Sequence, residues 1–363
     1  MNYKIKQNSE NFDHSNKYRI KQIPEDFIVK EVPSFVFNKE NGKYLIYKLK
    51  KIKRNTEDCI QFICRELKTK RKFVGFAGTK DKNAITEQYI SIFNIQNTKN
   101  RIEKLKDRFE NFSLEFIGFH DNPLSLGDLK ANRFEIVIRN LEKEFEIEKP
   151  YFIVNYFDDQ RFSGNNKEVG RAIIKKDFKS AVELLKKQNH LDKETLELYK
   201  TDYIKIIRHI PIKILKIFIH AYQSYLFNEL CKKIILEKKY TYLECNYSQG
   251  KLFFLTKEPN AKLNVNLPLI GFGSEIEGGF VDLVDEIMNK EELDLRDFII
   301  RQIPELSSFG TQRDFLIPVS NFSKEDFLDD ELNIGKKKIK VAFELAKGSY
   351  ATIVIKKILT NLV

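Results

Sequence analysis

The sequence predicts an α+β protein built from two parts, and three observations lead to this class. The chain has 363 residues, which is long for a single hydrophobic core, so two domains are expected. Before residue 150, short apolar runs alternate with polar residues, as half-buried strands do. After Pro150, apolar residues recur at helical spacing, most clearly over 214–236. With 42% hydrophobic residues, the chain can bury a sizeable interior.

The first 150 residues are expected to form a mixed or antiparallel sheet with one helix against it. The extended segments predicted there are 27–29, 44–49, 85–93, 112–119 and 133–138. Pro24, Glu25 and Asp26 predict a turn before the first of these segments. A helix is predicted with Thr56 as its N-cap, because acidic residues and then an apolar face at helical spacing follow it.

The middle of the chain is expected to be a helical insertion. Helical periodicity appears at 167–176, 178–187 and 214–236, and a strand at 338–345 with a helix at 350–359 ends the chain. Because this terminal unit resembles the first part more than the middle, it is expected to complete the first sheet. The predicted domains are therefore 1–150 with 317–363, and an insert over 151–316.

Cysteine and histidine spacing argues against metal and disulfide chemistry. The four cysteines form no CxxC and the five histidines no HExxH, so reduced thiols and a cytoplasmic location are expected. No apolar run approaches the roughly twenty residues that span a bilayer, and the N-terminus lacks a signal-peptide apolar region. Nothing in the sequence demands more than a monomer.

The basic residues are concentrated in one stretch. The net charge is +11, and between Lys43 and Lys82 thirteen basic residues stand against four acidic ones. Such clustering favours an RNA or DNA contact face. The alternative is a surface that is rich in lysine throughout.

Residues 73–86 are the most distinctive stretch of the chain. A short apolar run breaks at Gly78 into a polar turn that carries Asp81 between two lysines, and an extended segment follows. A carboxylate at the tip of a strand-turn-strand unit is held by rigid neighbours, as a reactive group requires. The alternative is that Asp81 only hydrogen-bonds its own turn. The stretch is not a nucleotide-binding P-loop, because Thr79 separates the last glycine from the lysine.

Residues 75–91, GFAGTKDKNAITEQYIS, resemble the central motif of the TruD family of tRNA pseudouridine synthases. Five further segments agree with the family in its order: IPEDFIV (23–29), ANRF (131–134), NYFDDQRF (155–162), AYQSYLFN (221–228) and FELAKGSYAT (343–352). Asp158 and Ser163 stand where the family commonly has glycine, and Ala346 where proline is frequent. These departures concern turn geometry.

The resemblance implies a pseudouridine synthase catalytic domain interrupted by an inserted TRUD domain. It implies an isomerase that acts on tRNA, with uridine 13 of the D arm as target, no cofactor and Asp81 as the essential residue. A carboxylate can attack C1′ of the ribose, take a ribose proton or stabilise an oxocarbenium-like centre by its charge. The sequence leaves all three routes open.

A uridine inside a folded tRNA must be flipped out to react, and a stacked aromatic ring recovers part of the lost stacking. From the residues alone, Phe134 is expected to be a core position of the strand 133–138, whereas the resemblance implies that it is the stacking platform. Asn132 is expected to hydrogen-bond the uracil edge or to hold the Asp81 loop.

Five further residues are expected at the substrate site. Lys21 is expected to pair with the aspartate and keep it ionised and oriented. Phe27 is expected beside the pocket, while Lys80 and Lys82 are expected to meet phosphates. Arg161 either lines the cleft or packs it.

Two alternative functions remain. A catalytically silent RNA-binding protein or RNA chaperone would keep the fold without conversion of uridine. A methyltransferase would need a glycine loop for S-adenosylmethionine after a strand, and the sequence shows none.

Overall fold

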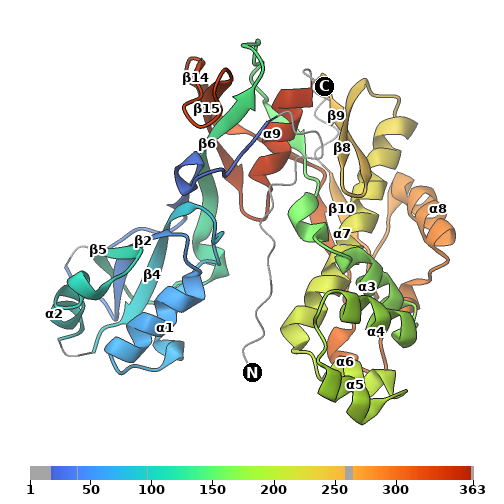
Figure 1. The fold of residues 1–363 in the computed structure, drawn as a ribbon, viewed down its shortest axis with the longest axis horizontal. Coiled ribbons are helices and arrows are strands. Elements are labelled where there is room, and N and C mark those ends of the chain that lie inside the picture. Colours follow the sequence, from blue (N-terminus) through green and yellow to red (C-terminus); the bar gives the residue numbers. More distant parts are fainter. Residues whose placement is uncertain (1–17, 39, 96, 258–264, 361–363) are drawn as a thin grey trace. The chain divides into compact units, whose positions relative to one another are not determined.

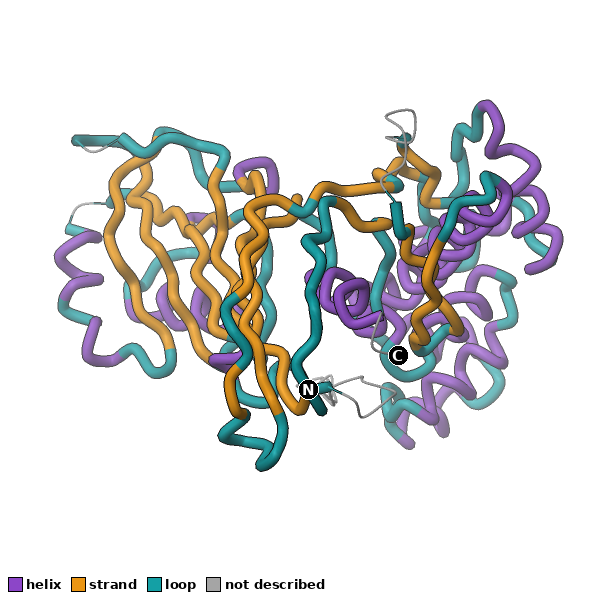
Figure 2. The backbone as a smooth tube through the Cα atoms, turned by 90° about the horizontal axis from the view of Figure 1, so that it is seen from above, coloured by secondary structure: helices purple, strands orange, loops and turns teal. Residues whose placement is uncertain are grey.

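The computed structural model describes residues 18–38, 40–95, 97–257 and 265–360. This part of the chain divides into two compact units. Residues 18–149 and 318–348 form the sheet unit, and residues 150–317 and 349–360 form the helical unit. Strands prevail in the first unit and helices in the second (Figure 2). The predicted α+β class with a mixed sheet and a mainly helical middle is thereby confirmed.

The sheet unit is built on a nine-stranded sheet whose main path runs β13-β15-β6-β1-β4-β2-β5. Two short strands lie off this path, β3 beside β4 and β14 beside β15. The pair β1–β4 is parallel, and the other pairs are antiparallel. The strands are β1 (Phe27–Pro33), β2 (Tyr44–Ile52), β3 (Val74–Phe76), β4 (Ile85–Phe93), β5 (Phe112–His120), β6 (Leu129–Leu141), β13 (Ser320–Lys324), β14 (Leu328–Asp329) and β15 (Lys337–Ala346).

Helix α1 (Thr56–Glu66) packs its apolar side against β2, β4 and β5 (Figure 1), and α2 (Thr98–Glu103) follows β4. Ile60 and Ile63 are almost fully buried there, and burial of each such side chain contributes about 1.5–3 kcal/mol. The N-cap position belongs to Asn55, so the prediction of Thr56 as N-cap is wrong by one residue. Thr56 lies instead in the first turn, 1% exposed, because its hydroxyl has partners inside the unit.

Strand β15 returns from the far end of the chain to the first sheet, as expected, and there it pairs with β6 along most of its length. Buried ion pairs secure this edge. Arg139 on β6 donates from Nε to Asp26 at 2.7 Å and from NH1 to Asp330 at 2.7 Å. Removal of one partner from such a buried pair typically costs roughly 3–5 kcal/mol. Arg139 therefore fixes both the entry into β1 and the loop after β14.

The helical unit is organised around α7, whose middle is buried on all sides. Helix α3 crosses α7 so closely at Gly170 that a Cβ there would lie 2.0 Å from the carbonyl oxygen of Phe218. No described helix is long and apolar enough to cross a membrane. The helices are α3 (Asn166–Ile174), α4 (Phe178–Lys187), α5 (Lys193–Tyr199), α6 (Tyr203–Arg208), α7 (Ile212–Glu237), α8 (Val281–Glu291) and α9 (Ala351–Leu359). Three strand pairs complete the unit: β7 (Phe152–Val154) with β12 (Leu316–Pro318), β8 (Tyr242–Tyr247) with β9 (Gly250–Leu255), and β10 (Asn266–Leu269) with β11 (Thr311–Asp314).

Helix α9 belongs to the helical unit, which differs from the predicted boundary at 317–363. The reason is a buried ion cluster. Lys356 on α9 forms an ion pair with Asp158 at 2.5 Å and a second one with Asp159. Asp158 has φ −102° and Ser163 has φ −52°, so neither position requires glycine. The departure from the family pattern at Asp158 thus supplies a partner for α9.

Candidate active site

The loop between β3 and β4 carries Asp81, and both of its ends are anchored in the sheet. The two strands pair antiparallel, with Val74 opposite Ile92 and Phe76 opposite Ile90. The strand-turn-strand arrangement predicted from the sequence is confirmed. Gly78 begins the loop with φ +148°, a conformation that residues with a Cβ rarely adopt.

A buried lysine holds the backbone of this loop. Nζ of Lys51, on β2, donates to the carbonyl oxygen of Asp81 at 2.6 Å and to that of Lys80 at 3.3 Å. Lys51 is 0% exposed, and burial lowers its pKa to about 8. The ammonium group thus gives up hydration and gains two backbone acceptors.

Two further buried polar side chains complete the support. The Thr56 hydroxyl accepts from the backbone N–H of Lys80 at 3.2 Å and donates to Gln88 Oε1 at 2.8 Å. Gln88, on β4, in turn donates from Nε2 to the carbonyl oxygen of Gly78 at 3.1 Å. The loop is therefore tied to β2, α1 and β4 by side chains that cannot reach water. Such a network aims the side chain of residue 81.

The Asp81 carboxylate is accessible and has a cationic neighbour. Its side chain is 34% exposed, and Oδ2 lies 2.8 Å from Nζ of Lys21. Lys21 has φ +60°, and its ammonium group lies 4.0 Å from the centre of the Phe27 ring. An ion pair on one side and a ring beneath the lysine restrict the directions in which the carboxylate can point.

Phe27 connects this ion pair to the second predicted segment, on β6. Its ring lies 6.1 Å from that of Phe134 in an edge-to-face arrangement, and Phe343 on β15 flanks Phe134 at 5.7 Å. Phe134 is 7% exposed. Asn132 lies two residues earlier on the same face of β6, and its Oδ1 is buried without a hydrogen-bond partner among the described residues. The structure thus brings Asp81, Lys21, Phe27 and Phe134 into one connected group.

Lys80 does not fit its predicted role as a phosphate contact. Its side chain is 8% exposed and forms an ion pair with Glu31 at 2.5 Å. Burial raises the pKa of Glu31, while the charge of Lys80 acts in the opposite direction. The pair therefore belongs to the interior, and Lys82, which is exposed, is the lysine of this loop that faces solvent.

Arg161, the remaining predicted residue, lies in the helical unit. Its guanidinium group lies 5.4 Å from the centre of the Phe157 ring. Sequence reasoning missed Lys51, Thr56, Gln88 and Glu31. Lys51 could have been recognised from the sequence, because the other residues of β2 that point to the same face are apolar.

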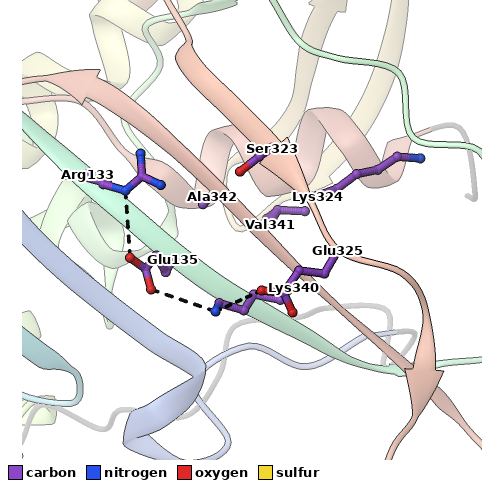
Figure 3. A pocket seen from close by; sticks show the side chains of 8 residues that line it. All are labelled: Arg133, Glu135, Ser323, Lys324, Glu325, Lys340, Val341 and Ala342. Atoms are coloured by element: carbon purple, nitrogen blue, oxygen red, sulfur yellow. Dashed lines mark ion pairs between the residues drawn. The ribbon is translucent and has the colours of Figure 1, made fainter.

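A hollow of about 190 Å³ lies on the sheet unit but is not this site (Figure 3). Arg133 and Glu135 line it, and these residues point to the face of β6 opposite to Phe134. Lys340 lies 3.0 Å from Glu325 and 4.0 Å from Glu135 (Figure 3). Two of the cations that line the hollow, Arg133 and Lys340, form ion pairs with neighbouring carboxylates.

The family model described as "tRNA pseudouridine synthase D (TruD)" matches residues 14–196, 184–244 and 251–358. The chain belongs to the TruD family of tRNA pseudouridine synthases. The predicted family and the predicted enzyme class, an isomerase, are thereby confirmed.

Individual relatives agree with the TruD assignment. A Methanocaldococcus jannaschii protein named "Probable tRNA pseudouridine synthase D 2" is 33% identical over 399 residues, covering 93% of this chain and 91% of the relative. A Leptospira interrogans protein named "tRNA pseudouridine synthase D" is 29% identical over 399 residues, covering 94% and 96%. A TruD crystal structure from Methanosarcina mazei matches with a TM-score of 0.66 at 27% identity, covering 94% of this chain and 93% of that one.

Substitution of Lys51 by Met should destabilise the protein by about 1–3 kcal/mol, because two loop carbonyl groups lose their buried donor. The effect should depend on pH. The pKa of Lys51 is about 8 in the folded protein and near 10.5 when unfolded, so the unfolded chain binds more protons between these values. The free energy of unfolding of the wild type should therefore rise relative to that of Lys51→Met from pH 8 to pH 10. Urea unfolding of both proteins at these pH values measures the difference, and a difference that stays constant or shrinks would contradict it.

Proposed function

We propose that this protein converts uridine to pseudouridine in tRNA, at uridine 13 of the D arm, with Asp81 as the essential catalytic residue. The observation that carries the proposal is the Asp81 carboxylate, which is 34% exposed and lies on a loop held by buried side chains. Membership in the TruD family supports the reaction. The tRNA target comes from the names of the relatives and from the resemblance of the motifs.

The geometry suits a reaction at the sugar of an extruded nucleotide. The glycosidic bond between N1 and C1′ breaks with its electron pair left on N1, the base turns, and a bond forms between C5 and C1′; C5 then loses its proton and N1 takes up a proton, so the product is an isomer of uridine. A fixed carboxylate can serve this sequence as nucleophile, as base or as a stabilising charge. Nζ of Lys21, which lies 2.8 Å from Oδ2 of Asp81, restrains the orientation of this carboxylate.

The target uridine must leave its stack, at a cost of a few kcal/mol. We propose that Phe134 recovers part of this by stacking on the uracil, with Phe27 fixing the ring from the side. The buried Oδ1 of Asn132 is the acceptor that could receive the N3–H of the base. Lys82, exposed at the loop, is suited to a phosphate of the flipped nucleotide.

Asp81→Asn should abolish pseudouridine formation, with a rate at least about 10³-fold lower, because the charge is lost while the side-chain shape remains. Binding of tRNA should stay within about twofold, since Lys51 holds the backbone of residue 81 and not its carboxylate. Primer extension after carbodiimide treatment of tRNA measures conversion and its position. Asp121→Asn, at an exposed position of the same unit, is the matched control.

Three results would contradict this part of the proposal. Conversion by Asp81→Asn close to that of the wild type would remove Asp81 from its role. Conversion by the wild type at another position of the tRNA would show that uridine 13 is not the target. A wild-type protein that binds tRNA but converts no uridine would establish the silent RNA-binding alternative.

Phe134→Leu should lower the single-turnover rate about tenfold, because stacking on one base is worth roughly 1–3 kcal/mol. Phe343→Leu is the matched control, since its ring is 0% exposed in the same aromatic group and cannot meet a base. Both variants should lose some stability, so rates are compared at a temperature well below both melting transitions. Equal rate losses in the two variants would assign Phe134 to the core alone.

A further inference from the structure

Two arginines of the helical unit share one aromatic ring. The guanidinium carbon of Arg313 lies 4.1 Å from the centre of the Phe157 ring, and that of Arg161 lies 5.4 Å from it. All three residues belong to the same unit, so their geometry is internal to it. Cations over a ring are attracted to its face, but two of them on one ring also repel each other.

Arg313 is held in place by Asn155 and by two aromatic rings, those of Phe157 and Phe227. It donates from Nε to the backbone oxygen of Asn155 at 3.1 Å and from NH2 to the side-chain oxygen of Asn155 at 2.5 Å. Asn155 is itself fixed, because its amide donates to the carbonyl oxygen of Asp314 at 3.1 Å. The guanidinium group of Arg313 is therefore held in one orientation before any ligand binds.

Arg161 differs from Arg313 in having no such partner. Its Nε is buried and makes no hydrogen bond within the described ranges, and no carboxylate of those ranges forms an ion pair with it. Both nearby aspartates, Asp158 and Asp159, are engaged by Lys356. A buried donor on a charged group without an acceptor costs free energy and points to a missing partner.

Arg161 and Arg313 also act on each other electrostatically. Burial lowers the pKa of Arg313 to about 10, and the charge of Arg161 lowers it too, while Tyr350 and Asp314 act in the opposite direction. Burial also lowers the pKa of His220, with Arg161 and Lys216 as further causes. An anion placed between these groups would relieve the repulsion.

We propose that Arg161, together with the ring-bound Arg313, binds a phosphate of the RNA backbone. The inference rests on the proposed function for the presence of RNA, and it assigns to the helical unit an anchor that is separate from the chemistry at Asp81. A planar guanidinium group fits two phosphate oxygens at once, and Phe157 restricts its plane. The buried Nε of Arg161, which has no hydrogen-bond partner among the described residues, would donate to this phosphate in the complex.

Arg161→Met separates this role from a structural one. Without RNA the variant should melt at the same temperature as the wild type or higher, because an unpaired buried donor is replaced by an apolar chain of similar length. Its affinity for tRNA should fall about tenfold at low salt. The slope of log Kd against log salt concentration should fall in magnitude by about 0.7–0.9, which corresponds to one lost phosphate contact.

Two variants complete the design. Arg161→Lys keeps the charge and should recover part of the affinity and most of the salt slope. Arg301→Met makes the same substitution at an exposed arginine of the helical unit and should change neither quantity. A lower melting temperature of Arg161→Met with an unchanged salt slope would assign Arg161 to packing and overturn the proposal.

A second measurement distinguishes RNA from a small anion. Melting is followed with inorganic phosphate and with chloride at equal ionic strength. Phosphate could stabilise the wild type but not Arg161→Met, while the slope of log Kd for tRNA against log salt concentration is the same for both proteins. In that case the site binds a free anion and the RNA assignment is wrong. Absence of pseudouridine formation by the wild type would overturn the proposed function alone, since a reduced salt slope in Arg161→Met would still establish the phosphate contact.

Discussion

The candidate site depends on the contact between a fully buried ammonium group and the backbone of one loop. Lys51 lies at the end of β2, and its two hydrogen bonds fix the peptide groups on either side of the Asp81 α-carbon. The loop could not be held in this way by its own residues, because a turn of this length satisfies few of its carbonyl groups internally. Lys51 is itself immobilised because β2 pairs with β4 and β5. The register of the sheet therefore determines the position of Asp81.

The same constraint explains the pattern of charges around the loop. Lys51 binds carbonyl groups, Lys80 binds Glu31 inside the unit, and Lys21 binds Asp81 at the surface. Three lysines near one carboxylate thus have three separate tasks, and only one of them pairs with Asp81 itself. The aspartate stays accessible because the other two cations are committed elsewhere.

Much of this arrangement could be predicted from the sequence. The rest could not be predicted, for one physical reason. Alternation of apolar and polar residues places 85–93 and 133–138 in strands, while the expectation that Asn132 and Phe134 belong to one site came from the family resemblance. Alternation does not show which strand lies beside which. The pairing of Lys80 with Glu31, the hydroxyl contacts of Thr56 and the attachment of α9 through Lys356 all join segments that are distant in the chain. From local sequence, Lys80 was expected to contact a phosphate, Thr56 to cap a helix and α9 to belong to the first domain. Tertiary contacts determine a different place for each of them.

The central claim is that the Asp81 loop presents its side chain to the sugar of an extruded uridine. A crystal structure of the Asp81→Asn variant bound to its tRNA tests this most directly, because the substitution is expected to halt the reaction while it leaves the loop contacts in place. The account predicts one uridine turned out of its stack, with its ribose within about 3.5 Å of the residue 81 side chain. It also predicts a loop backbone still bonded to Lys51. A uridine bound elsewhere on the protein, or a ribose more than about 8 Å from residue 81, would contradict the account.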